Sequence, residues 1–294
     1  MKTIKKTELI LNADGSIYHL HALPGEIAET IFLVGDPERV PFVSKHFDTI
    51  EIKKQNREFV IHTGIKNGIR ASVISTGIGT DNIDIVLNEI DALFNIDFKT
   101  YHIKDNLTAL KFIRIGTSGA IQPNLPIDSW VASEHAFGFD ALGGYYPTTE
   151  NKNCIDVTNA LLYKLSTLTG MENRPYLSSA SPQLLAQLPA SFIHGVTVTM
   201  PGFYAPQGRV LRAQTRYSLD LVSFLNAQEY CEKLFTNIEM ETAGIYLLAS
   251  LLGHEAISLS AILANRITDE FSANPEKTIQ LGIEEILDCF LKPL

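Results

Sequence analysis

The segment Phe112-Ile113-Arg114-Ile115-Gly116-Thr117-Ser118-Gly119 predicts a buried strand that runs into a glycine-rich turn, as is typical of an α/β sheet. The turn offers backbone amides and hydroxyls that can bind an oxyanion, although an ordinary β-turn is the simpler explanation of the glycines alone. Within the strand, Arg114 interrupts an apolar run, and an unpaired buried guanidinium is energetically costly. We therefore expect Arg114 to have an anionic partner, which can be Glu58, Asp36 or a ligand.

The alternation of short β-branched runs with longer amphipathic runs continues on both sides of this strand. It predicts further strands at 31–34, 57–63, 69–75, 193–199 and 256–264, and helices at 38–46, 81–94 and 241–252. A hairpin turn at Asn67-Gly68, an N-cap at Asp81 and a C-cap at Gly253 mark the ends of some of these elements. Residues 95–111 exceed the usual connection of about 4–6 residues, which predicts a surface insertion. No linker or repeat divides the sequence, so we expect residues 1–294 to form a single α/β domain with a central mixed β-sheet flanked by helices.

The composition limits the partners of the protein. The 294 residues are 45% hydrophobic and carry a net charge of -9. Binding to nucleic acid or to an anionic membrane requires a basic surface, which this acidic composition does not favour. Three cysteines, at positions 154, 231 and 289, support neither a disulfide framework nor a cysteine-based zinc site. The uncharged, largely apolar stretch 242–253 is shorter than the roughly 20 residues that span a bilayer, and the basic start lacks a signal-peptide core. These features favour a cytoplasmic protein without nucleic acid, membrane or bound metal.

Three segments rich in glycine or proline contain candidate ligand-binding residues. Gly35-Asp36-Pro37-Glu38-Arg39 follows a predicted strand and can hold a phosphate, although a capped helix start with an exposed ion pair fits as well. Gly77-Ile78-Gly79 looks like the start of a dinucleotide fingerprint, but Asn82 stands where the third glycine is required. In Phe203-Tyr204-Ala205-Pro206-Gln207-Gly208-Arg209, the amide and guanidinium suit the polar edge of a pyrimidine, whereas a solvated loop is the alternative.

Taken together, six short motifs resemble the nucleoside phosphorylases, and within that family they look most like the uridine phosphorylases. The resemblance extends from about His19 to the C-terminal helix. The motifs occur in the family's order and read Gly35-Asp36-Pro37-x-Arg39, Arg57-Glu58-Phe59, Ser75-Thr76-Gly77-Ile78-Gly79, Arg114-Ile115-Gly116-Thr117-Ser118-Gly119-Ala120, Glu239-Met240-Glu241 and Asn265-Arg266. Each is short, but their combination in this order is highly specific.

The resemblance implies that inorganic phosphate, a co-substrate rather than a cofactor, attacks C1′ of a nucleoside and releases ribose 1-phosphate and the free base. It implies no cofactor, and it implies a homo-oligomer with active sites shared between subunits, for which a dimer and a hexamer both remain open. The phosphate ligands implied are Gly35, Arg39, Arg114 and Thr117, with Arg57 from a neighbouring subunit. Several arginines would offset the cost of desolvating a phosphate through charge-assisted hydrogen bonds.

The same resemblance assigns the sugar, the base and the catalytic groups. The ribose contacts implied are Thr117, Glu239, Met240 and Glu241, with His19 reaching the 5′-hydroxyl in the adjacent subunit. The base contacts implied are Ser118, Gly119, Phe203, Gln207, Arg209 and Arg266. The catalytic groups implied are Arg114, Gln207, Arg209 and Glu241. Because Gln207 and Arg209 would stabilise negative charge on the departing base, no general acid is required.

Two departures from the family pattern concern the substrate and ions. Purine-cleaving relatives have an aspartate near the end of the strand that here reads Leu263-Ala264-Asn265-Arg266, and the acid Asp269 lies beyond those four residues. Some members bind a monovalent cation between subunits through Glu58 and a serine, but Asn82 replaces that serine, so we predict no metal ion. The sequence thus predicts uridine phosphorolysis. A purine nucleoside phosphorylase and a water-using nucleosidase are the alternatives, and a non-catalytic nucleoside-binding protein is disfavoured.

Overall fold

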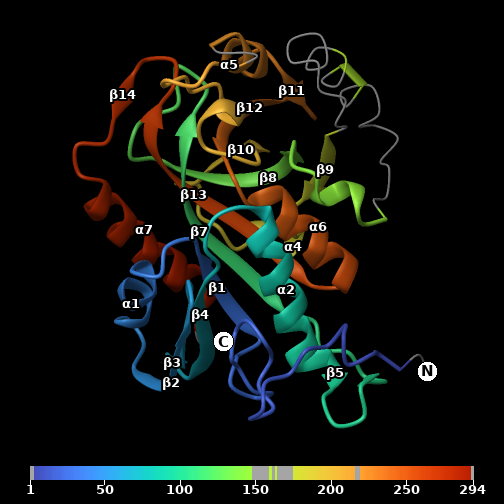
Figure 1. Cartoon of the computed structure of the whole chain (residues 1–294). Coiled ribbons are helices and arrows are strands. Elements are labelled where there is room, and N and C mark those ends of the chain that lie inside the picture. The colour runs from blue at the N-terminus through green and yellow to red at the C-terminus, as the bar shows by residue number, and fades with distance from the viewer. Residues whose placement is uncertain (1–2, 148–158, 161–162, 164–174, 216–218, 293–294) are drawn as a thin grey trace.

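A mixed β-sheet runs through the computed structural model, which describes residues 3–147, 159–160, 163, 175–215 and 219–292 (Figure 1). The strands are β1 (Thr30–Val34), β2 (Thr49–Asn56), β3 (Phe59–Lys66), β4 (Ile69–Ser75), β5 (Ile96–Asp97), β6 (His102–Ile103), β7 (Lys111–Ala120), β8 (Trp130–Gly138), β9 (Tyr176–Ser179), β10 (Ile193–Thr199), β11 (Glu229–Tyr230), β12 (Lys233–Glu239), β13 (Glu255–Asn265) and β14 (Glu270–Phe271). In this part of the chain the strand order is β11-β12-β10-β8-β13-β7-β1-β4-β3-β2, with β9 beside β8 and β14 beside β13. The predicted α/β class with a central mixed sheet is confirmed.

Strand β7 lies in the middle of the sheet between two parallel partners, β1 and β13. β12 runs antiparallel to the end of β7 and also pairs with β10, while β10 pairs with β8 and β8 with β13. These five strands therefore close into a ring. Pairing with β13 continues along Gly116-Thr117-Ser118-Gly119, so the turn predicted there is wrong, and β7 extends as a strand to Ala120.

Helices cover both faces of the sheet (Figure 1). They are α1 (Arg39–Ser44), α2 (Thr80–Asn95), α4 (Pro182–Leu185), α5 (Leu219–Asn226), α6 (Thr242–Leu252) and α7 (Pro275–Phe290), with short 3-10 turns η1 (Leu142–Gly144) and η3 (Ala205–Gln207). One face of the sheet packs against α2 and α6, and the other packs against α1 and α7. Among the described helices, none combines the length and the apolar character needed to cross a bilayer.

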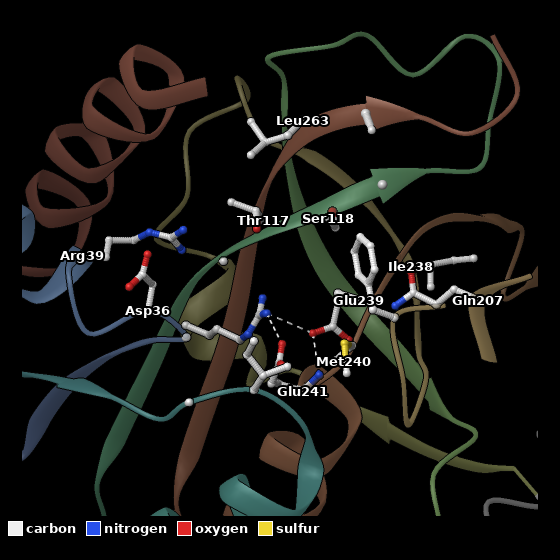
Figure 2. A pocket seen from close by; sticks show the side chains of 18 of the residues that line it. Asp36, Arg39, Thr117, Ser118, Gln207, Ile238, Glu239, Met240, Glu241 and Leu263 are labelled. Atoms are coloured by element: carbon white, nitrogen blue, oxygen red, sulfur yellow. Dashed lines mark hydrogen bonds and ion pairs between the residues drawn. The ribbon is translucent and has the colours of Figure 1, made fainter. Parts of the chain in front are cut away.

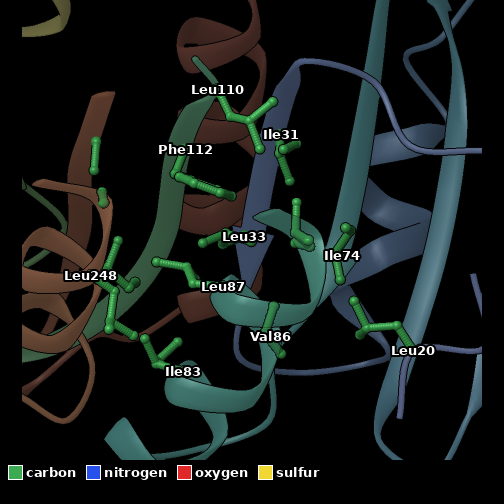
Figure 3. Close-up of a cluster of buried hydrophobic side chains, with 14 of the residues drawn as sticks. Leu20, Ile31, Leu33, Ile74, Ile83, Val86, Leu87, Leu110, Phe112 and Leu248 are labelled. Carbon is green, nitrogen blue, oxygen red and sulfur yellow. The ribbon is translucent and has the colours of Figure 1, made fainter. Parts of the chain in front are cut away.

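The two-residue period of a strand explains on which face Arg114 lies. Phe112 packs in the core formed with α2 and α6, where Leu87 and Leu248 also lie (Figure 3). Ile113 belongs instead to the core formed with α1 and α7. Arg114, two residues after Phe112, therefore faces the side of the sheet that α2 and α6 cover.

Most predicted elements are confirmed, with ends that differ by a few residues. The Asn67-Gly68 turn joins β3 and β4, and Gly253 ends α6 in the left-handed conformation at φ 79°. The predicted N-cap at Asp81 is wrong, because α2 starts directly after Gly79, whose φ of 94° turns the chain into the helix without a side-chain cap. Arg57 was predicted in a strand but lies in the turn between β2 and β3, with φ 53°.

The insertion at 95–111 lies outside the main sheet. It contains the β5–β6 pair, and the N-terminal segment packs against it. The N–H of Ile4 donates to the C=O of Tyr101 at 2.9 Å, and Thr3 forms a bridge with His102. The insertion is therefore tied to the start of the chain and away from the carboxyl ends of the central strands.

Candidate active site

A cavity of about 1170 Å³ opens where β1, β7, β12 and β13 end (Figure 2). Small-molecule pockets usually measure about 300–1,000 Å³, so a nucleoside and a phosphate fit together. The cavity is lined by Gly35, Arg39, Arg114, Thr117, Ser118, Gly119, Phe203, Gln207, Arg209, Glu239, Met240, Glu241 and Arg266, all of them predicted from the sequence. Two other predicted site residues, His19 and Arg57, do not line it.

Arg114 is buried in the cavity wall beside two carboxylates. Its Nη2 pairs with Oε2 of Glu241 and lies 3.3 Å from Oε2 of Glu239. Burial opposes the positive charge, but the two carboxylates outweigh it and raise the pKa of Arg114. The anionic partners within the protein are thus Glu239 and Glu241, and the candidates Glu58 and Asp36 are wrong.

Gly116 leaves the space that the Arg114 guanidinium occupies. A Cβ atom at position 116 would lie 1.8 Å from Nη1 and 2.4 Å from Cζ of Arg114, far inside contact distance. Ser260, the register partner of Gly116 on β13, accepts a hydrogen bond from the same Nη1 at 3.1 Å. A glycine is therefore required here for the guanidinium to lie against the sheet.

The side chain of Glu239 fixes the start of α6. Its oxygens accept hydrogen bonds from the backbone N–H groups of Glu241 at 2.8 Å and Thr242 at 2.9 Å, and from the Thr199 hydroxyl at 2.6 Å. The same Thr199 oxygen accepts the N–H of Ala243 at 2.9 Å. These bonds satisfy N–H groups that a helix start leaves without partners. Both carboxylate oxygens of Glu239 thus already accept hydrogen bonds from protein groups. A contact between Glu239 and ribose remains a prediction.

Glu241 connects the N-terminal ends of two helices. Its Oε2 pairs with Arg114, and its Oε1 accepts the N–H of Gly79, immediately before α2, at 2.8 Å. Burial raises the pKa of Glu241 against the lowering effect of Arg114, and the nearby Glu239 raises it further. Each carboxylate oxygen can accept a further hydrogen bond, so Glu241 can still accept hydrogen bonds from the hydroxyl groups of a sugar. Met240 lies beside it on the cavity wall (Figure 2).

Arg39, the first residue of α1, supplies a second guanidinium to the same cavity. Its Nη1 donates to the C=O of Ile115 at 3.4 Å. Burial, followed by the charge of Arg114, lowers the pKa of Arg39, while Asp36 counteracts this effect. Two guanidiniums that repel each other and are largely removed from water favour an anion between them.

Phe203, Gln207 and Arg209 form another polar part of the cavity. Nη1 of Arg209 donates to Oε1 of the buried Gln207 and to the C=O of Phe203, the latter at 2.7 Å. The guanidinium lies 3.8 Å from the centroid of the Phe203 ring, a cation–π distance. Arg266 Nη1 donates to the C=O of Gln207 at 3.0 Å. Burial, together with Arg266, lowers the pKa of Arg209 to about 10, so Arg209 remains positive at neutral pH.

Sequence reasoning missed residues near this part of the cavity. Asp269 and Phe271 line it from the hairpin between β13 and β14, and Ile238 and Leu263 add apolar surface. The hairpin lacks the glycine that usually marks such a turn, because Asp269 itself adopts φ 58°. In the sequence, only the acidic residue at position 269 indicated that a residue after β13 could line the cavity.

Glu58 and Asn82 both lie close to Gly77 at the cavity. A Cβ atom at Gly77 would be 2.2 Å from Nδ2 of Asn82 and 3.1 Å from Cγ of Glu58. Within the ranges that the structure describes, no three His, Cys, Asp or Glu side chains gather into a metal-binding group. That the protein works without metal or cofactor remains a prediction.

His19 and Arg57 lie close together, outside the cavity of their own chain. The Asn56 side chain donates to the C=O of His19 at 2.7 Å, and the Arg57 guanidinium lies 5.9 Å from the centroid of the Tyr18 ring. Two residues that the sequence assigned to a neighbouring subunit thus share one patch, although they are distant in sequence. Their contribution to a neighbour remains a prediction.

Comparison with known proteins places these observations in a family. The model of the phosphorylase superfamily matches residues 29–291. The uridine phosphorylase of Thermococcus kodakarensis is 30% identical over 276 residues, which cover 92% of this chain and 86% of that protein. A DeoD-type purine nucleoside phosphorylase of Alkaliphilus metalliredigens is 30% identical over 260 residues, which cover 88% of this chain and 92% of that protein.

A solved structure agrees over nearly the whole chain. The crystal structure of a Trypanosoma brucei nucleoside phosphorylase, described as showing uridine phosphorylase activity, superposes with a TM-score of 0.85 at 28% identity. The match covers 96% of this chain and 99% of the other. On the sequence match, the shared architecture and the cavity together, the chain belongs to the phosphorylase superfamily.

Proposed function

We propose that the chain catalyses the phosphorolysis of uridine to uracil and ribose 1-phosphate. The observation that supports this most is that Arg39, Arg114 and Glu241 line the same cavity as Gln207 and Arg209. Groups suited to phosphate, sugar and pyrimidine are thereby available to one bound substrate pair. The relative from Thermococcus kodakarensis and the Trypanosoma brucei structure favour the same reaction.

Phosphate is the nucleophile in this proposal and binds between Arg39 and Arg114, whose mutual repulsion it relieves. Gly35 and Thr117 add hydrogen bonds from the ends of β1 and β7. Charge-assisted bonds offset the desolvation of the dianion and direct one oxygen toward C1′. That oxygen forms a bond with C1′ while the bond from C1′ to N1 of uracil breaks, and the electron pair leaves with the base.

Glu241 stabilises the sugar during this exchange. It accepts hydrogen bonds from the 2′- and 3′-hydroxyls, and its negative charge favours the oxocarbenium-like transition state. Met240 packs against the sugar as an adaptable apolar surface. Because Glu239 holds the start of α6, it keeps Glu241 and Arg114 in a fixed relation.

The base departs as an anion, so the site has to stabilise negative charge on uracil. Gln207 and Arg209 bind the N3–H and C4=O edge, while the Phe203 ring stacks on the base. Ser118 and Gly119 of β7 complete the base contacts, and Arg266 holds Gln207 through its backbone. The positive Arg209 takes the role that a general acid would otherwise have.

A neighbouring subunit completes the site in this proposal. His19 contacts the 5′-hydroxyl and Arg57 contacts the phosphate of the adjacent chain, and their common patch outside their own cavity supports this arrangement. The protein is then a cytoplasmic homo-oligomer with shared active sites.

A purine nucleoside phosphorylase is the second candidate. Its support is the DeoD-type relative and the acid Asp269, which lines the cavity and could assist the departure of a purine. Arg266 at the end of β13, with Gln207 and Arg209 beside it, favours uridine instead. A nucleosidase that uses water would not need the paired guanidiniums of Arg39 and Arg114.

The test is the kcat/KM of the full chain for uridine, thymidine, inosine and adenosine at saturating phosphate, repeated without phosphate. The proposal requires the highest value for uridine and no release of base without phosphate. Preference for inosine or adenosine would replace it with a purine nucleoside phosphorylase. Release of base without phosphate would favour a nucleosidase, and binding without turnover a nucleoside-binding protein.

A further inference from the structure

One carboxylate outside the cavity holds the segment that contains His19. Glu89, on α2, accepts hydrogen bonds from the backbone N–H groups of His19 at 3.0 Å and Leu20 at 2.9 Å. Its Oε1 also lies 2.6 Å from Nδ1 of the His19 ring. The side chains of Glu89 and His19 are 13% and 26% exposed, so water competes weakly for these bonds. Glu89 thus fixes both the backbone and the ring of His19.

These contacts determine which ring nitrogen of His19 carries the hydrogen. Both oxygens of Glu89 accept hydrogen bonds from backbone N–H groups, as the oxygens of a carboxylate do. The atom that faces Nδ1 of His19, Oε1, is therefore a hydrogen-bond acceptor. A neutral imidazole has one donor nitrogen and one acceptor nitrogen, and the bond made by one determines the role of the other. Nδ1 therefore carries the hydrogen, and Nε2 on the opposite edge of the ring keeps a free lone pair.

The chain on either side of His19 is held as well. Asn56 donates to the C=O of His19, and Nζ of Lys54 donates to the C=O of His21 at 3.1 Å. His21 adopts the left-handed conformation at φ 51°, which a non-glycine residue keeps only when its surroundings enforce it. The imidazole is thus presented by a pre-formed segment next to Arg57.

We propose that Glu89 is a positioning residue for the active site of the neighbouring subunit. It holds His19 as the Nδ1–H tautomer, so that Nε2 accepts a hydrogen bond from the 5′-hydroxyl of the nucleoside bound there. The inference rests on the proposed function, because it takes His19 as the residue that reaches the neighbour's ribose. Glu89 touches no substrate and acts only through His19, so its loss affects only nucleosides that have a 5′-hydroxyl.

The variant Glu89→Gln tests this role, because the amide can present its NH₂ group to Nδ1 and reverse the tautomer at nearly unchanged size. Its matched control is Glu26→Gln. Glu26 also anchors this segment, by accepting the N–H of Leu23 at 2.6 Å and pairing with Lys54, but within the described part of the chain it forms no hydrogen bond or ion pair with His19. For each full-length variant we would measure kcat/KM for uridine and for 5′-deoxyuridine at saturating phosphate.

We expect Glu89→Gln to lower kcat/KM for uridine by about tenfold and for 5′-deoxyuridine by less than about twofold, as loss of a carboxylate behind a functional histidine commonly does. The control should leave the ratio of the two substrates unchanged. In a His19→Ala background, Glu89→Gln should have no further effect on uridine. Equal losses on both substrates, or an unchanged uridine value, would overturn the proposal.

A second readout needs no turnover. Nitrogen-15 NMR of the wild-type protein in mildly alkaline buffer should show His19 with a hydrogen on Nδ1 and none on Nε2, and Glu89→Gln should reverse this. A wild-type hydrogen on Nε2 would overturn the proposal even if uridine is cleaved. Absence of any phosphorolysis, by contrast, would refute the proposed function, so the two failures are distinguishable.

Discussion

Replacing Gly116 with alanine should disable phosphate use without changing any group that contacts phosphate. The added Cβ would lie 1.8 Å from Nη1 of Arg114, whereas ordinary contact begins at 3.4 Å. The guanidinium must therefore retreat by about 1.6 Å from the sheet, because the Arg114 side chain is the group that the new Cβ would meet and it is able to move. Its hydrogen bond to Ser260 and its pairing with Glu241 would both be disturbed.

The size of the effect follows from this displacement. A misplacement of about 1 Å in a catalytic arrangement can cost about 100-fold in rate, which corresponds to about 2.7 kcal/mol of transition-state free energy. We expect kcat/KM for phosphate to fall by about 100-fold in Gly116→Ala. Overpacking should also lower the free energy of unfolding by about 1–3 kcal/mol.

The assay is the initial rate of uracil release as phosphate is varied at saturating uridine, with urea unfolding measured in parallel. Gly144→Ala is the matched control, since a Cβ there meets nothing within 4 Å and Gly144 lies in η1, away from the cavity. It should leave phosphate kinetics unchanged. If Gly116→Ala does the same, phosphate binding does not depend on the position of Arg114 over the glycine, and the reasoning is refuted.

Three further predictions concern the base, the helix start and pH. Gln207→Ala should lower kcat/KM for uridine by about tenfold, the equivalent of one hydrogen bond, and lower that for inosine less; parallel kinetics on the two substrates would check this. Thr199→Val should lower the free energy of unfolding by about 1–2 kcal/mol in urea, because its hydroxyl links Glu239 to the N–H of Ala243 at the start of α6. Burial raises the pKa of Asp140 above its unfolded value, so the folded state binds this proton more tightly and gains stability as the pH falls through the raised pKa. The unfolding free energy of the wild type should therefore rise relative to that of Asp140→Asn as the buffer is acidified from neutral pH, and a constant difference would contradict this.

The sequence could predict the elements whose apolar pattern is regular. Residues 193–199 were predicted as a strand and form β10 with the same bounds, because their alternation is clear. β12 was missed, since it contains Thr236 and Asn237, which are buried polar residues. The Asn237 side chain donates to Ser118 of β7 at 2.9 Å, and this contact depends on the closure of the strand ring. Such polar burial is decided by tertiary pairing, which local sequence does not reveal.

For the site, the motifs indicated which residues would come together but not how they would pair. Arg114 was expected to need an anion, yet Glu241 was not identified as its partner, because that contact depends on the α6 start meeting the face of β7. The role of Gly116 could not be predicted either, because it depends on the Arg114 guanidinium lying against the sheet at this position. Asp269 lines the cavity from a hairpin turn that contains no glycine, so the sequence did not predict the turn. Pairing, side-chain direction and turn geometry are therefore what the structure adds.

The most direct test of the central claim is the stoichiometry of products when the full chain is given uridine with and without phosphate. Phosphorolysis requires equal amounts of uracil and ribose 1-phosphate, and no uracil when phosphate is omitted. Free ribose as the product, or uracil release that does not depend on phosphate, would contradict it.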